Sequence, residues 1–177
     1  MKIALFLGSF NPFHNGHLEV VKTALNDFKM DKVIIVPTMQ NPWKEEKVLD
    51  IDKRYEIIST VIFSRRFDDR VKIFLIEKEL IPPYYSYATL HALKNKYCND
   101  EVFVLCGEDT MKSIPDWMNG GQIIKDYNFL IVDRPENGIS SSEIRQKIKD
   151  NKPINGLVSN NVINLIQKYY NKRENCQ

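Results

Sequence analysis

The feature that most constrains the fold is an apolar run that ends at a glycine and is followed by a helix. Residues 3–7 form a run typical of a buried strand, and a turn begins at Gly8-Ser9. Beyond the turn, apolar residues recur with helical spacing at Leu18, Val21, Ala24, Leu25 and Phe28. A strand, a glycine turn and a helix start together favour anion binding, because backbone N–H groups and the helix dipole point to one place.

Two histidines stand at this helix start. The chain has three histidines, and two of them, His14 and His17, fall here with a spacing that puts both on one face of a helix. Both rings would then reach the same phosphate. The alternative is a strand–helix turn with two incidental histidines, which we find less favoured because so few histidines are available.

Strands and helices alternate along the rest of the chain. Near-continuous apolar strands between amphipathic helices imply a parallel sheet covered on both faces. We therefore predict a single α/β domain over residues 1–177, a doubly wound Rossmann-like sheet of about five strands with a helical C-terminal part from about residue 140. The later strands are predicted at 32–37, 71–76, 101–106 and 127–132.

Three helices are predicted between and after these strands. Asp52 is expected to cap a helix that carries Tyr55, Ile58, Val61 and Ile62 on one face. Ser86 opens the next helix, and a final helix over 159–170 is expected only to pack against the rest.

The composition excludes several classes of protein. An apolar content of 43% fits a globular protein, and a net charge of +2 argues against nucleic acid as the main partner. The sequence has no apolar run of the roughly 20 residues that cross a membrane and no segment typical of a signal peptide. Cys98, Cys106 and Cys176 lack metal-ligand spacing, which favours a reducing, cytoplasmic setting, with Cys106 in the core.

The candidate ligand-binding residues follow the predicted strands. Ligands of doubly wound sheets bind outside the carboxyl ends of the strands. Gly8-Ser9 follows the first strand, Pro37-Thr38 the second, Gly107-Glu108-Asp109 the fourth, and Arg134 the fifth. We expect these segments to meet at one edge of the sheet.

A second chemical element lies at residues 139–145. Ser140 and Glu143 have the spacing of a capping box, so one interpretation is simply a well-formed helix start. The hydroxyls of Ser140, Ser141 and Ser142 are also good phosphate ligands, and Arg145 lies one turn further on. A guanidinium can bridge two phosphate oxygens, and both interpretations can hold together.

The two elements resemble the motifs of the HxGH nucleotidylyltransferases. Residues 8–17, Gly-Ser-Phe-Asn-Pro-Phe-His-Asn-Gly-His, have the form G-x-F-x-P-x-H-x-G-H, and residues 139–145 are similar to the ISSTxxR motif of the same superfamily. Residues 84–90, 104–109, 114–117, 130–135 and 154–170 are similar to nicotinate-mononucleotide adenylyltransferases. The resemblance spans most of the chain and implies transfer of AMP from ATP to nicotinate mononucleotide, with release of pyrophosphate.

The resemblance also implies roles for individual residues. His14, His17 and Arg145 would be catalytic. ATP would be bound by Gly8, Ser9, Phe10, Gly107, Asp109, Arg134, Ser140, Ser141 and Ser142. The acceptor would be bound by Lys44, Ser86, Thr89 and Trp117. Mg²⁺ would be held through the ATP phosphates rather than by protein side chains.

Some of these residues have simpler interpretations, and other functions stay open. Asp109 could cap a helix, Trp117 could belong to the core, and Lys44 could be a solvated loop charge. The chain departs from the family at Asn41-Pro42-Trp43-Lys44, at Asn11 in place of aspartate, and in the short 136–138 connection. We expect the exchange at Asn11 to matter little, because the backbone shapes that turn.

The alternatives to nicotinate mononucleotide are a nicotinamide mononucleotide acceptor, a pantetheine-phosphate adenylyltransferase, a CMP transferase, or a nucleotide-binding regulator. The expected partners are ATP and a pyridine mononucleotide, with neither nucleic acid nor membrane; homo-oligomerisation stays open.

Overall fold

A five-stranded parallel sheet forms the centre of the computed structural model, which describes residues 1–39, 47–67, 69–133 and 138–171. The strands run in the spatial order β3-β2-β1-β4-β5, and every pairing between neighbours is parallel. The predicted Rossmann-like sheet is therefore confirmed. The strands are β1 (Lys2–Gly8), β2 (Lys32–Pro37), β3 (Val71–Ile73), β4 (Glu101–Gly107) and β5 (Asn128–Val132).

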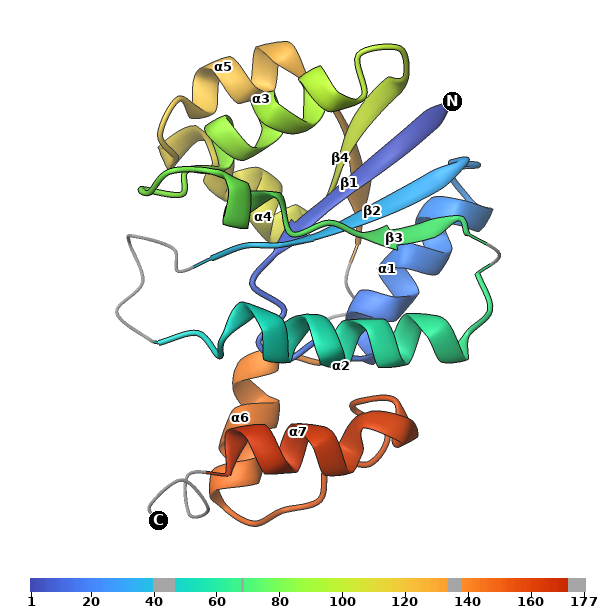
Figure 1. The fold of residues 1–177 in the computed structure, drawn as a ribbon, viewed down its shortest axis with the longest axis vertical. Helices are drawn as coiled ribbons and strands as arrows, with labels where there is room; N and C mark the ends of the chain where they lie inside the picture. Colours follow the sequence, from blue (N-terminus) through green and yellow to red (C-terminus); the bar gives the residue numbers. More distant parts are fainter. Residues whose placement is uncertain (40–46, 68, 134–137, 172–177) are drawn as a thin grey trace.

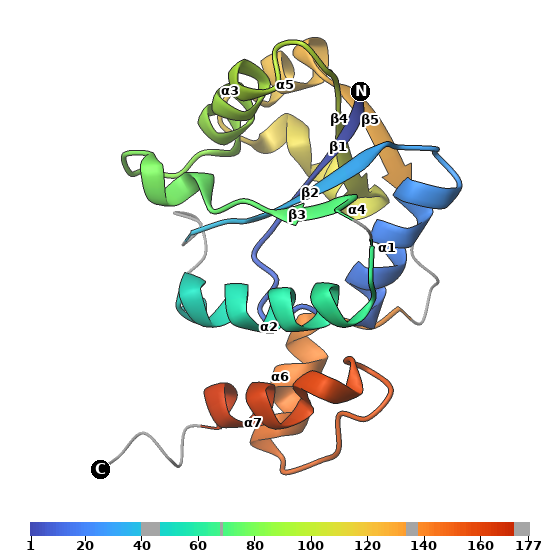
Figure 2. The same ribbon diagram turned by 45° about the vertical axis from the view of Figure 1, so that its right-hand side comes forward.

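Helices cover both faces of the sheet, as Figures 1 and 2 show. Helices α1 (Asn15–Asn26) and α2 (Ile51–Ser64) lie on one face, while α3 (Ser86–Lys96), α4 (Glu108–Ser113) and α5 (Gly120–Asp126) lie on the other. Side chains of β1 alternate between two cores. Ala4 and Phe6 face α1 and α2 in the first core, whereas Ile3 and Leu5 face α3 in the second core. This alternation explains why the strand is apolar at consecutive positions.

In its described residues, the C-terminal part adds two helices to the core on the α1–α2 side and no strand to the sheet. Helices α6 (Ser141–Lys149) and α7 (Ile163–Tyr170) lie beyond α2, on its side away from the sheet (Figures 1 and 2). Ile144 and Ile148 of α6 and Ile166 of α7 are buried in the same cluster as the side chains of α1 and α2. The helical C-terminus predicted from about residue 140 is confirmed.

The third strand is shorter than predicted. The third strand ends at Ile73 rather than at residue 76, and a 3₁₀ helix (Ile76–Glu79) follows it. Ile76 is buried in the second core, so its apolar character reflects packing of a turn rather than a place in the sheet.

The capping and the buried face of α2 also differ. Asp50, not Asp52, is the N-cap of this helix, since its carboxylate accepts the N–H of Asp52 at 2.9 Å. Tyr55, predicted on the buried face, is 42% exposed, and Arg54 is buried beside it.

The final helix is shorter than predicted. It begins at Ile163, preceded by a 3₁₀ turn (Asn160–Val162); a further 3₁₀ turn (Ile114–Asp116) follows α4. Cys106 is buried in β4, as predicted, whereas Cys98 is exposed and Cys176 lies outside the described residues. Across the described part of the chain, none of the helices combines the length and the apolar character that crossing a membrane requires.

Candidate active site

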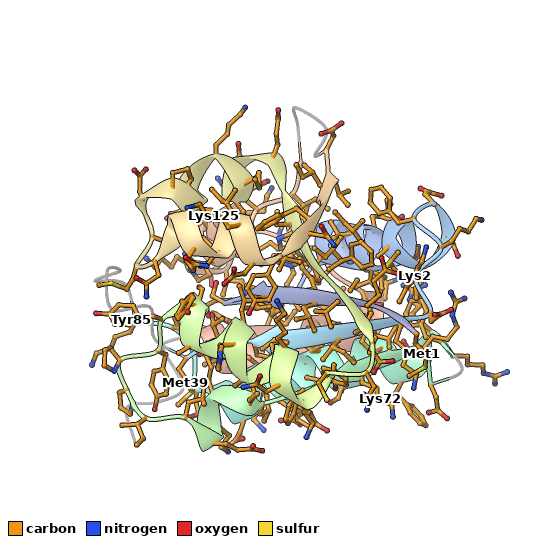
Figure 3. The ribbon with its side chains drawn as sticks, turned by 90° about the horizontal axis from the view of Figure 1, so that it is seen from above. Met1, Lys2, Met39, Lys72, Tyr85 and Lys125 are labelled. Atoms are coloured by element: carbon orange, nitrogen blue, oxygen red, sulfur yellow. The ribbon has the colours of Figure 1, made fainter. Side chains whose placement is uncertain are left out.

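The candidate site lies at the carboxyl edge of the sheet. In the view of Figure 3, Met39, which comes just after β2, lies at the opposite end of the molecule from Met1 and Lys2 at the start of β1. The order of strands changes direction between β1 and β4, which is where doubly wound sheets bind ligands. Gly8 and Gly107 end these two strands, so the structure brings the two predicted glycine segments to neighbouring strand ends.

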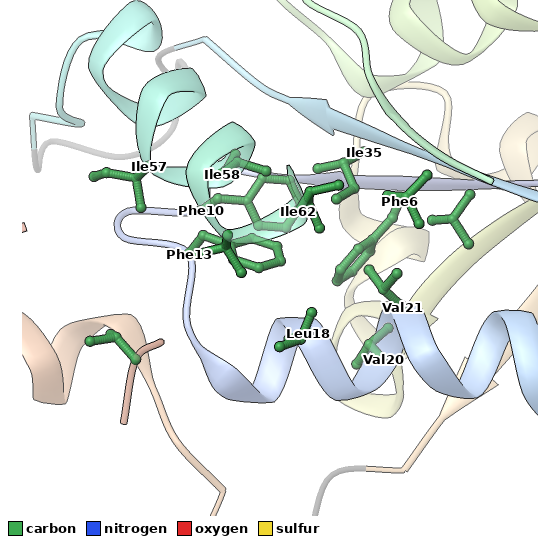
Figure 4. Close-up of a cluster of buried hydrophobic side chains, with 14 of the residues drawn as sticks. Phe6, Phe10, Phe13, Leu18, Val20, Val21, Ile35, Ile57, Ile58 and Ile62 are labelled. Atoms are coloured by element: carbon green, nitrogen blue, oxygen red, sulfur yellow. The ribbon is translucent and has the colours of Figure 1, made fainter. Parts of the chain in front are cut away.

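A tightly packed loop leaves the end of β1. We call residues 8–12 the phosphate loop, after the expectation from the sequence that this segment binds phosphate. Phe10 has a backbone φ of 46°, and its ring is 2% exposed, lying edge-on to Phe6 at 5.1 Å between ring centres. Figure 4 shows Phe10 and Phe13 between the isoleucines of α2 and Leu18 of α1. A Cβ atom at Gly8 would lie 3.0 Å from the Phe10 ring, so glycine is needed there to let the ring fold back.

The two histidines stack at the start of α1. Their ring centres are 3.7 Å apart, with an angle of 26° between the planes. His14 is the N-cap residue, and its backbone N–H donates to Nδ1 of His17 at 3.2 Å in a reciprocal capping box. A neutral imidazole that accepts at Nδ1 carries its proton on Nε2, so His17 is set to donate from Nε2. Phe10 and Phe13 pack against this ring at 5.0 and 5.3 Å.

Helix α6 docks its first turn on the phosphate loop. Ser140 caps the helix by accepting the N–H of Glu143 at 3.1 Å, which is the serine half of the predicted capping box. Ser141 Oγ donates to the carbonyl of Pro12 at 2.9 Å, and Arg145 donates to the carbonyl of Asn11 at 2.6 Å and to Ser142 Oγ at 3.2 Å. The two motifs are thus in direct contact, and Arg145 binds the loop that leads into His14.

The side chain of Asn11 has a larger role than the sequence suggested. It is 5% exposed, and its Oδ1 accepts the N–H of Leu49 at 3.2 Å and the hydroxyl of Tyr170 at 2.6 Å. The side chain therefore helps to hold the loop as well as the backbone, and the small effect expected of asparagine in place of aspartate stays a prediction, because an aspartate oxygen could accept the same two bonds. The expectation that the last helix only packs is wrong, because its Tyr170 reaches the phosphate loop. Burial raises the pKa of Tyr170, so the phenol stays protonated and donates.

Two buried charged residues behind the loop were missed in the sequence. Arg54 is 2% exposed and donates to the carbonyls of Ser9 and Leu49, each at 2.6 Å. Glu77 is 1% exposed and accepts the N–H of Met39 and, at 2.7 Å, the hydroxyl of Thr89. Thr89, predicted to contact the acceptor, is itself fully buried with its hydroxyl turned to this carboxylate.

A cavity of about 280 Å³ opens beside His14. Its walls come from α1, from the end of β5 and from the start of the segment that leads to α6. The lining residues include His14, Gly16, Val20, Thr23, Val132, Asp133 and Ile139. A Cβ atom at Gly16 would lie 3.1 Å from the His14 ring, so glycine at this position leaves room for the ring.

The other predicted residues lie around the same sheet edge or outside the described part of the chain. Gly107 is buried as the N-cap of α4, and Asp109 is exposed in the first turn of that helix without being its cap. Trp117 is half-buried against the second core, in line with the core interpretation, and Ser86 begins α3. Lys44 and Arg134 lie outside the described residues.

The arrangement supplies hydrogen-bond donors for an anion. Two imidazoles, a guanidinium, serine hydroxyls and the start of a helix of nine residues gather around one loop. Among the described residues, no three His, Cys, Asp or Glu side chains come together as metal ligands. A polyphosphate is the ligand that suits this set of donors.

Comparisons with known proteins agree with this geometry. Residues 5–147 match the cytidylyltransferase-like family. The chain is 31% identical to a probable nicotinate-nucleotide adenylyltransferase of Fusobacterium nucleatum, covering 96% of this chain and 99% of the relative. It is 29% identical to the nicotinate-nucleotide adenylyltransferase of Bacillus subtilis, covering 94% and 96%.

Solved structures share the fold. A putative nicotinate-nucleotide adenylyltransferase from Vibrio parahaemolyticus superposes with a TM-score of 0.80 at 21% identity, over 97% of this chain and 96% of the other. Plasmodium falciparum nicotinic acid mononucleotide adenylyltransferase, solved in complex with NaAD, superposes with a TM-score of 0.78 at 19% identity, over 96% and 97%.

Proposed function

The chain belongs to the cytidylyltransferase-like family, with nicotinate-nucleotide adenylyltransferases as its relatives, and from this premise we propose that it transfers AMP from ATP to nicotinate mononucleotide. The products are pyrophosphate and deamido-NAD, a step of NAD biosynthesis. The observation that carries the proposal is the docking of α6 on the phosphate loop, which brings Arg145 into contact with the loop that leads into the histidine pair.

The reaction needs alignment and charge stabilisation rather than a protein nucleophile. A 5′-phosphate oxygen of the mononucleotide attacks the α-phosphorus of ATP, and the bond from that phosphorus to the bridging oxygen of the β-phosphate breaks. The electron pair leaves with pyrophosphate. Since a phosphate oxygen is already nucleophilic at neutral pH, the protein has to hold two anions in line and stabilise the growing negative charge.

The donors of the site match these two tasks. His17 would donate from Nε2 to the α-phosphate and the leaving oxygen, with its ring held by His14, Phe10 and Phe13. Arg145 and the start of α6, with Ser140, Ser141 and Ser142, would hold the pyrophosphate part.

The nucleoside of ATP would occupy the cavity beside His14, which the first turns of α1 and Ile139 border. Gly8, Ser9 and Phe10 would offer backbone groups to the phosphates, Gly107 and Asp109 would meet the ribose, and Arg134 would lie near the adenine. Mg²⁺ bound by the phosphates and water would neutralise part of their charge, since its preferred ligands are oxygens. The described side chains fit this arrangement because they supply donors rather than a carboxylate cage.

The acceptor would lie on the α3–α4 side of the same edge. Trp117 would stack on the pyridine ring, and Ser86 and Lys44 would meet the polar groups of the mononucleotide. The buried Thr89 hydroxyl would act through Glu77, while its segment of α3 lines the acceptor side. We also propose a cytoplasmic location, because the three cysteines without metal-ligand spacing favour a reducing compartment.

A side-by-side assay tests the proposal. Pyrophosphate release is measured with ATP, Mg²⁺ and one of three acceptors: nicotinate mononucleotide, nicotinamide mononucleotide or phosphopantetheine. We expect the highest kcat/KM with nicotinate mononucleotide. A preference for either of the other acceptors would overturn the assignment of the substrate, and release with none of them would indicate a nucleotide-binding regulator.

A further inference from the structure

The buried Arg54 holds two separate pieces of the active-site edge together. Its Nε donates to the carbonyl of Leu49, and one terminal nitrogen donates to the carbonyl of Ser9, each at 2.6 Å. Leu49 in turn donates its N–H to Asn11 Oδ1 at 3.2 Å. Arg54, Leu49, Asn11 and Ser9 therefore close a ring of hydrogen bonds around Phe10, the loop residue with a positive φ.

This ring fixes the orientation of one peptide group of the phosphate loop. In a trans peptide the carbonyl and the following N–H point in opposite directions, and the bond between Ser9 and Phe10 is trans. Because Arg54 draws the Ser9 carbonyl inward, the N–H of Phe10 points away from Arg54. A phenylalanine in the left-handed region is disfavoured by itself, so its surroundings must hold it there.

The charge of Arg54 is balanced within the protein. Burial lowers the pKa of Arg54, while the carboxylates of Asp50 and Glu77 favour its charged form. Burial raises the pKa of Glu77, whereas the hydrogen bonds from Met39 and Thr89 and the positive charge of Arg54 each act to lower it. A buried arginine that served only stability could be replaced, together with its counter-charge, by apolar groups at little cost.

We propose that Arg54 is a positioning residue for ATP: by holding the Ser9 carbonyl and, through Leu49, the Asn11 side chain, it turns the N–H of Phe10 toward the triphosphate. This inference rests on the proposed function. It assigns to Arg54 a role that acts through the backbone of the loop, without contact with substrate.

Three variants separate positioning from stability. Arg54→Lys keeps the charge but concentrates the donors on one nitrogen, which cannot replace the planar fork on two carbonyls. We expect kcat/KM for ATP to fall about 100-fold through a higher KM for ATP, as for a small misplacement of a binding group. Arg70→Lys is the matched control, because Arg70 also binds backbone carbonyls, those of Leu25 and Met30, at the opposite edge of the sheet. It should lower stability and leave both KM values unchanged.

The double variant Arg54→Met with Glu77→Gln removes both buried charges and keeps similar volumes. We expect it to unfold below the wild-type temperature, because the carbonyls of Ser9 and Leu49 lose their donor, and to keep the raised KM for ATP. Recovery of the wild-type KM for ATP in the double variant would overturn the proposal, because charge balance would then be the whole role of Arg54. If Arg54→Lys does not fold, the KM for ATP of the double variant tests the proposal in its place.

A measurement on the wild type decides independently of any variant. Backbone amide resonances of ¹⁵N-labelled protein are followed during titration with the non-hydrolysable α,β-methylene-ATP. We expect the Phe10 resonance to shift strongly, and an unmoved Phe10 resonance in a saturated complex would overturn the role of Arg54. If Phe10 shifts but ATP and nicotinate mononucleotide yield no pyrophosphate, the proposed function fails while the role of Arg54 in nucleotide binding stands.

Discussion

His17 is the side chain on which the proposed chemistry depends most. Three aromatic rings fix its position, and the N–H of His14 occupies its Nδ1, which leaves Nε2 as the donor. A ring held in this way loses little entropy when it binds a phosphate, so its hydrogen bond can strengthen as charge grows in the transition state.

Replacing His17 by alanine should lower kcat by at least about 100-fold, the usual cost of losing one donor to a developing negative charge. The far-UV circular dichroism should stay that of the wild type. The control is His91→Ala, which removes the exposed histidine of α3. Near-normal turnover in His17→Ala would remove the role proposed for this ring.

Sequence reasoning found the residues whose motif is contiguous and missed those that act through the backbone. His14, His17, Ser142 and Arg145 were predicted because their spacing alone places them at helix starts. Arg54 was missed because its partners are carbonyl groups, which a sequence does not display. One signal was available: Arg54 stands three residues after Ile51 and four before Ile58, on the buried face of α2.

At the scale of elements, helix α7 contacts the phosphate loop through a residue at its C-terminal end. Tyr170 at its end donates to Asn11 Oδ1 at 2.6 Å, while its neighbour Tyr169 donates to the exposed Glu56. The two adjacent tyrosines therefore offer a matched comparison between a hydrogen bond to the loop and one at the surface.

Tyr170→Phe should lower the free energy of unfolding by about 1 kcal/mol, the net value of a partly buried hydrogen bond. Tyr169→Phe should change it less, since a solvent-exposed bond exchanges readily with water. Urea denaturation of both variants measures the difference. Equal effects of the two substitutions would show that the contact with Asn11 does not stabilise the loop.

Strands and helices with clear hydrophobic periodicity were predicted well, whereas their first and last residues were predicted less accurately. The bounds of β2 and the start of α3 agree with the prediction because a proline and a serine mark them. Residues 74–76 were assigned to a strand because an apolar run looks the same whether it packs in a sheet or in a turn. The cap of α2 was misplaced because Asp50 and Asp52 are both good caps in sequence.

At the scale of the whole molecule, the N-terminal and C-terminal parts of the chain meet at the site. Among the described residues, five hydrogen bonds join residues 11–15 to the C-terminal part, through Ser141, Arg145, Gly156, Leu157 and Tyr170. The buried side chains of α6 and α7 belong to the core that lies under α1 and α2. We therefore propose that residues 1–177 fold as one domain.

Thermal unfolding should show a single transition, coincident in near-UV and far-UV circular dichroism. Because ATP would bind only the assembled site, α,β-methylene-ATP should raise the midpoint, by an amount equivalent to about 2.7 kcal/mol at a hundred times its Kd. A separate early transition of α6 and α7 would contradict a single domain.

The central claim is that the histidine pair and the start of α6 receive one triphosphate. The most direct measurement is a crystal structure with α,β-methylene-ATP and Mg²⁺. The account predicts the α- and β-phosphates within hydrogen-bond distance of His17 Nε2 and the Arg145 guanidinium, with the nucleoside in the cavity beside Gly16. Phosphates bound elsewhere, for instance in the pocket between α6 and α7 lined by Lys152 and Lys168, would contradict it.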